Sequence, residues 1–75
     1  MSMAYVLINS EAGCEAEVMK ELNKISGVRE AHRVYGVYDI IIKVEAEDMV
    51  DLKETVLSRV RKLGKVRSSI TLICV

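Results

Sequence analysis

The stretch Val34–Val44, with the sequence VYGVYDIIIKV, decides how this 75-residue chain is organised. Its pattern predicts a strand that ends at Tyr35, a turn at Gly36, and a second strand whose start carries Asp39. Glycine at a turn adopts positive φ angles easily and leaves neighbouring backbone amides accessible. Free amides beside a carboxylate could hold both ends of a small zwitterion such as an amino acid. A plain β-hairpin with an acidic residue next to its turn explains the same pattern.

Strands are predicted on both sides of this turn, because short runs of β-branched and other apolar residues recur along the chain. The predicted strands are Ala4–Asn9, Val28–Tyr35, Tyr38–Glu45 and Val66–Val75.

Two stretches between these strands have the apolar spacing of amphipathic helices. The first is predicted over Cys14–Ser26, with Gly27 as part of its stop signal. The second begins at Asp48, which is expected to be its N-cap, and ends at Gly64, expected at the C′ position. Its predicted buried stripe is Met49, Leu52, Val56, Val60 and Leu63, with Leu57 at the edge.

The resulting order, β-α-β-β-α-β, predicts one domain over residues 1–75 with an α+β, ferredoxin-like fold. Right-handed crossovers place both helices on one face of a four-stranded antiparallel sheet. The first strand is apolar on both faces, with Tyr5 and Leu7 opposing Ala4, Val6 and Ile8, and the last strand shares this property. An uncovered apolar face marks a partner interface, so we expect the other sheet face to be buried in a homodimer.

Composition argues against several classes of function. The 11 basic and 11 acidic residues give zero net charge, which disfavours direct nucleic-acid binding. No apolar run approaches the ~20 residues of a membrane span, and no signal segment is evident, so a cytoplasmic location is expected. Cys14, Cys74 and His32 lack the spacing of metal ligands, so no cofactor is expected. No nucleophile–base pair is evident, and we therefore expect no enzyme activity.

A second polar cluster lies where the last strand begins, in the run Arg67-Ser68-Ser69-Ile70-Thr71. Ser69 and Thr71 fall on one face of a strand because side chains alternate with a period of two. Their hydroxyl groups could hydrogen-bond a carboxylate. A hydrated start of a strand explains these residues equally well.

Over essentially its whole length the sequence resembles the RAM domain, the effector domain of the Lrp/AsnC (feast/famine) transcription regulators. The resemblance is carried by Ala4–Asn9 before the Gly13 turn, by Tyr35–Val44, and by Val66–Leu72. It implies that the domains pair through their sheets, that dimers assemble further into a ring such as an octamer, and that free amino acids bind between dimers at the glycine turn. The implied ligand-binding residues are Gly36, Val37, Tyr38, Asp39, Ser68, Ser69 and Thr71.

The expected function is thus amino-acid effector binding coupled to oligomerisation, without catalysis. Family regulators carry an N-terminal helix-turn-helix domain, whereas here the first predicted strand already begins at Ala4. A stand-alone domain that acts on a full-length regulator is therefore expected. Two alternatives stay open: an oligomeric scaffold that recruits a regulator without binding a ligand, and an ACT-like regulatory module. The usual ACT first loop is absent from Asn9–Gly13.

Overall fold

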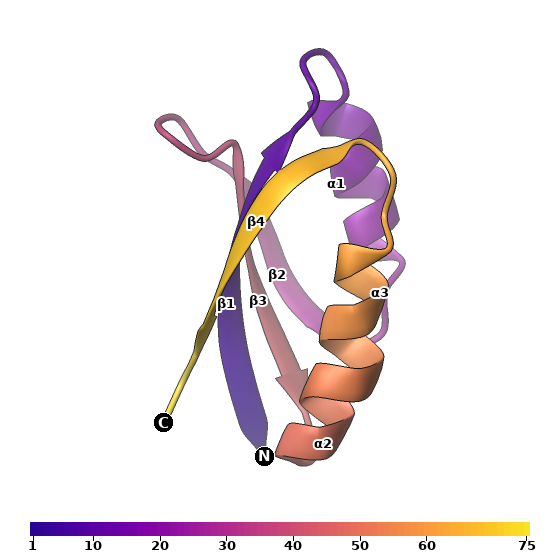
Figure 1. Cartoon of the computed structure of the whole chain (residues 1–75), viewed down its shortest axis with the longest axis vertical. Coiled ribbons are helices and arrows are strands. Elements are labelled where there is room, and N and C mark those ends of the chain that lie inside the picture. Colours follow the sequence, from indigo (N-terminus) through magenta and orange to yellow (C-terminus); the bar gives the residue numbers. More distant parts are fainter.

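Strands and helices alternate along the chain in the predicted order, and the ferredoxin-like α+β fold is confirmed (Figure 1). The structure is a computed structural model that describes residues 1–75. The strands are β1 (Ser2–Ser10), β2 (Val28–Arg33), β3 (Ile40–Ala46) and β4 (Val66–Ile73). The helical segments are α1 (Glu15–Asn23) and the consecutive pieces α2 (Met49–Asp51), η1 (Leu52–Leu57) and α3 (Ser58–Arg61).

The four strands form one antiparallel sheet in the order β2-β3-β1-β4. In the register of the two central strands, Val6 lies opposite Ile42 and Ile8 lies opposite Ile40. Figure 1 shows both helices on the same face of this sheet and both termini at the same end of the molecule. The loop between β2 and β3 projects from the other end, away from the helices.

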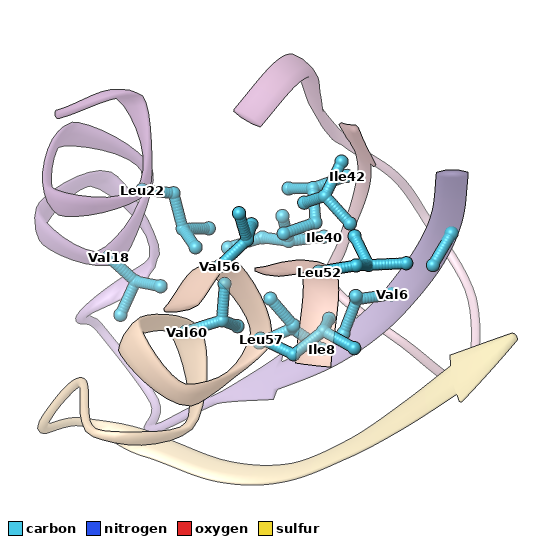
Figure 2. Packing of buried hydrophobic residues seen from close by; sticks show 12 residues of the cluster. Val6, Ile8, Val18, Leu22, Ile40, Ile42, Leu52, Val56, Leu57 and Val60 are labelled. Atoms are coloured by element: carbon cyan, nitrogen blue, oxygen red, sulfur yellow. The ribbon is translucent and has the colours of Figure 1, made fainter. Parts of the chain in front are cut away.

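The hydrophobic core fills the space between the sheet and the helices (Figure 2). Every second residue of β1 and β3 points into it, as the alternation of strand side chains requires. The buried cluster comprises Ala4, Val6, Ile8, Val18, Leu22, Ile40, Ile42, Val44, Leu52, Val56, Leu57 and Val60.

The second helix differs in its winding from the α-helix that the sequence predicts, because its middle turn, η1, is π-helical. In a π-helix the hydrogen bonds join residues five apart, so Leu57 turns toward the same side as Leu52. Leu57, which the sequence places at the edge of the stripe, is fully buried with the core. The predicted N-cap is confirmed, since the Asp48 carboxylate accepts a hydrogen bond from the Asp51 amide at 2.8 Å.

The predicted boundaries around the glycine turn and after the second helix need correction. The predicted strand ends at Tyr35 and Tyr38 are wrong: β2 stops at Arg33 and β3 starts at Ile40. A six-residue loop, 34–39, replaces the tight glycine turn, because the Val34 amide donates to the Asp39 carbonyl (2.8 Å) and closes the loop at its base. After the second helix, Lys65 adopts the left-handed conformation (φ 69°) that we expected at Gly64.

The sheet face away from the helices carries an apolar patch formed by Tyr5, Leu7, Ile41, Ile70 and Leu72. The register places Tyr5 opposite Leu72 and Leu7 opposite both Ile70 and Ile41. Ile70 and Leu72 are 45% and 52% exposed. The two-sided apolar character that the sequence predicts is confirmed for β1, whereas β4 is apolar on the open face but carries Ser69 and Thr71 on the helix side.

Candidate ligand-binding site at one end of the sheet

Loop 34–39 presents backbone amides that the chain itself does not use. None of the amides of residues 35–38 donates a hydrogen bond within the chain. Gly36 has a φ of +156°, and a Cβ built on it would meet no atom within 4 Å, so open space surrounds it. Val37 is largely exposed, and Tyr38 is half-buried. The loop therefore offers several free N–H donors, the groups that bind a carboxylate or another small anion.

Asp39 lies at the base of this loop and is fixed to β1. Its amide donates to the Ile8 carbonyl at 3.0 Å. Its carboxylate oxygen Oδ2 accepts two hydrogen bonds from Ser10, one from the amide (3.0 Å) and one from the hydroxyl (3.2 Å). The second oxygen, Oδ1, makes no hydrogen bond within the chain.

No lysine, arginine or histidine pairs with the Asp39 carboxylate. Asp39 is half-buried, and within the chain its carboxylate is met only by the two hydrogen bonds from Ser10. Asp39 therefore has both a structural contact, through Oδ2, and an unused acceptor, through Oδ1.

The hydroxyl groups of β4 lie at the same end of the sheet, on the other side of β1. Ser69 lies opposite Ile8 and Thr71 opposite Val6, so both are on the helix side, as the period of two predicts. Ser68 points the other way and accepts a 3.5 Å hydrogen bond from the Asn9 side chain. Neighbouring strands are about 4.8 Å apart, so β3 and β4 are separated by roughly 10 Å. The two predicted clusters thus flank the end of β1 and do not touch each other.

Ser10 also belongs to this candidate site, although the sequence alone did not mark it as a site residue. It is the only buried polar residue of the chain, 3% exposed. One sequence signal could have found it: Ala4, Val6 and Ile8 alternate into the core, and Ser10 continues that alternation.

The hollows of a single chain do not coincide with this site. A cavity of about 430 Å³, lined in part by Gly27, Arg29, Glu45 and Arg59, opens near the termini. A second hollow, of about 370 Å³, lies over the start of the second helix. Because ligand sites normally enclose most of the ligand, loop 34–39 would need a second chain to complete a binding cavity.

The histidine, cysteine and acidic side chains do not gather into a metal-binding group. No group of three or more His, Cys, Asp or Glu side chains could hold a metal ion, and both cysteines are free. His32 contacts Glu30 at 3.2 Å on the open sheet face, with Lys43 also near Glu30 at 3.8 Å. The hydrogen bond from His32 and the charge of Lys43 lower the pKa of Glu30. No helix is both long and apolar enough to cross a membrane.

Comparison with known proteins gives a consistent match. The model of the Lrp/AsnC ligand-binding domain matches residues 3–75. An uncharacterised helix-turn-helix transcriptional regulator of Pyrococcus furiosus is 33% identical over 73 residues, which are 93% of this chain and 49% of that protein. The chain therefore spans about half the length of this curated relative.

Two further matches differ in the fraction of the matched protein that they cover. The crystal structure of FFRP-DM1 superimposes with a TM-score of 0.93 at 37% identity, and the match covers both chains completely. The homocitrate synthase of Sulfolobus acidocaldarius is 37% identical over 54 residues, which are 72% of this chain and only 11% of that enzyme. The resemblance to an enzyme is thus confined to a small part of it. By its sequence and its fold, this chain belongs to the Lrp/AsnC ligand-binding domain family.

Proposed function

We propose that this chain is a non-catalytic effector module that binds a free amino acid at loop 34–39 and couples binding to its own assembly. The observation that carries the proposal is the pairing, within one loop, of unused backbone amides with an unpartnered carboxylate oxygen on Asp39. Free amides match a carboxylate, and a free carboxylate oxygen matches an ammonium. An α-amino acid carries both groups on one carbon.

In this arrangement the amides at Gly36 and Val37 receive the ligand carboxylate, and Asp39 Oδ1 receives the ammonium. The hydroxyls of Ser69 and Thr71 lie about two strand spacings from β3, on the helix side of β4, so in this proposal they interact only with a ligand side chain that extends across the end of β1. Neutral hydroxyl groups contribute less than charged partners, so they adjust ligand preference more than overall affinity.

Binding is coupled to assembly, because the loop is open in a single chain and a second copy has to close it. The exposed side chains of Tyr35 and Val37 on the loop, and the apolar patch on the sheet, supply surfaces for such contacts. We assign the patch to a sheet-to-sheet dimer and the loop to contacts between dimers. A ligand that binds only where the interface exists stabilises the assembled state by mass action. A full-length regulator of the same family is the proposed downstream partner.

The family match does not favour the ACT-like alternative. The scaffold alternative, an oligomer that recruits a regulator without a ligand, makes a different prediction: no amino acid binds to the assembled protein.

Isothermal titration of the chain with each of the twenty protein amino acids tests the proposal. We expect at least one of them to bind the wild type. The Asp39→Asn variant keeps an oxygen for Ser10 but loses the charge, so it should bind that amino acid at least about tenfold more weakly, since a charged hydrogen bond contributes about 1.5–3 kcal/mol. The matched control is Glu47→Gln, which removes an exposed carboxylate near the opposite end of the sheet and should bind like the wild type.

A second variant, Gly36→Val, tests the loop. An added Cβ would meet no atom within 4 Å, but a φ of +156° is strained for valine, so a folded variant that does not bind implicates the loop conformation or ligand crowding. Light scattering on every variant checks that assembly is unchanged. If the wild type and the Asp39→Asn variant bind with equal affinity and assemble equally, Asp39 is not part of the binding site. If none of the twenty amino acids binds, the proposal is refuted.

A further inference from the structure

Ser10 makes an unusual contact for a buried serine: both of its donors reach the same acceptor atom. Its amide and its hydroxyl donate to Asp39 Oδ2 at 3.0 Å and 3.2 Å, across 29 residues of sequence. Without such contacts, the χ2 torsion of an aspartate side chain has a broad, roughly two-fold distribution. Two donors on a strand that is itself paired on both sides fix the plane of the carboxylate and leave Oδ1 as the unused oxygen.

The position of Ser10 also joins the two halves of the candidate site. The register between β1 and β4 shifts here: Asn9 lies opposite Ser68, but Ser10 lies opposite Val66, so Arg67 is an extra residue on β4. Such a bulge re-aims the side chains around it. Ser10 therefore contacts the base of the ligand loop on one side and borders the irregular start of β4 on the other.

A structural role alone accounts for one part of this arrangement, because a buried hydroxyl needs a partner. It does not account for the choice of that partner. A backbone carbonyl would satisfy the hydroxyl, whereas here the acceptor is a half-buried carboxylate that forms no ion pair with a basic side chain. The contact places that charge, in a fixed orientation, at the foot of the open loop.

We propose that Ser10 is a positioning residue that orients Asp39 to receive the ligand ammonium. This inference rests on the proposed function and deepens it, since it assigns a residue outside the loop to the recognition of the α-amino group. Ser10 does not touch the amino acid; it acts through Oδ2 of Asp39, and the ammonium binds Oδ1.

The test is titration calorimetry with two probes: the amino acid that binds tightest among the twenty, and the 2-hydroxy acid of the same side chain, which lacks the ammonium. Ser10→Ala should weaken binding of the amino acid about threefold to tenfold, since one hydrogen bond that orients the acceptor is lost. It should leave the hydroxy acid within twofold of its wild-type affinity. Ser10→Thr, which keeps a hydroxyl, should recover part of the loss.

Two controls separate positioning from general damage. Ser26→Ala removes an exposed serine near the opposite end of the sheet and should bind both probes like the wild type. In the Asp39→Ala background, Ser10→Ala should cause no further loss, because its effect passes through Asp39. If Ser10→Ala does not fold, Ser10→Cys, with a weak donor of similar size, replaces it in the same comparison.

The outcomes are distinct. Selective weakening of the amino acid supports the inference. Equal weakening of both probes, or additive losses in the double variant, overturns the inference while the proposed function stands. If the wild type binds none of the twenty amino acids, the proposed function fails and the role of Ser10 fails with it.

Discussion

Replacing Gly27 by alanine should destabilise the fold more than any other glycine substitution in the chain. Gly27 has a φ of +100° and joins α1 to β2, and its carbonyl accepts a 2.8 Å hydrogen bond from the Glu45 amide. A Cβ at this position would lie 2.7 Å from Cγ2 of Val56 and 3.0 Å from the carbonyl oxygen of Glu45. Both neighbours belong to packed elements, η1 and β3, so neither moves freely.

The magnitude follows from two costs and one gain. An L-residue in the left-handed region costs about 1–2 kcal/mol, and overpacking a tight site costs about 1–3 kcal/mol. Alanine also lowers the conformational entropy of the unfolded chain, and this gain in stability offsets about 0.4–1 kcal/mol of the two costs. We therefore expect the free energy of unfolding to fall by about 2–4 kcal/mol. A domain of this size gains only about 3–5 kcal/mol from its core, so most of its stability would be lost.

Thermal unfolding followed by circular dichroism measures this loss. One kcal/mol corresponds to a shift of about 4–8 °C in a domain of 60–100 residues, so the midpoint should fall by at least about 10 °C. Gly64→Ala is the matched control, because Gly64 has no positive φ and no neighbour within 4 Å of an added Cβ. All samples are measured at the same protein concentration, since assembly shifts the midpoint of thermal unfolding. Equal midpoints for the two variants would refute the packing of Gly27 against η1.

Two further predictions concern the open sheet face. Leu7→Glu puts a charge into the apolar patch and should leave a folded chain that light scattering reports as a monomer. Ile8→Glu, at a fully buried neighbour, should instead unfold the chain. Dimers of the Leu7→Glu variant would contradict the proposed interface. The hydrogen bond from His32 and the charge of Lys43 lower the pKa of Glu30 from 4.5, so its stabilising effect is present above pH 4.5 and is lost as the pH falls through the lower value in the folded chain. In an NMR titration His32→Ala should raise the Glu30 midpoint toward 4.5, and an unchanged midpoint would exclude this contact.

Local patterns in the sequence determined the element order, the alternation of β1 and the N-cap at Asp48. These features depend on neighbours within a few residues, either through side-chain periodicity or through a single hydrogen bond to a nearby amide. The same periodicity placed Ser69 and Thr71 on one face of β4 and predicted that β1 is apolar on both sides.

Tertiary structure decided how the site is built. The glycine turn became a six-residue loop because its closing hydrogen bond joins Val34 to Asp39, and not the residues nearest Gly36. The spacing of apolar residues specifies neither the π-helical winding of η1 nor the full burial of Leu57. Such choices arise where packing against another element outweighs local preference.

The contact between Ser10 and Asp39 is the clearest case of what the sequence alone leaves open. Each residue can be assigned locally, Ser10 to the end of a strand and Asp39 to the neighbourhood of a turn. Their meeting requires the pairing of β1 with β3 and the position of loop 34–39 over the end of β1. Because that pairing is long-range, its register is fixed only when the hydrophobic faces of both strands pack against the helices. The sequence therefore determined which groups are present, and the packed sheet determined which of them share one site.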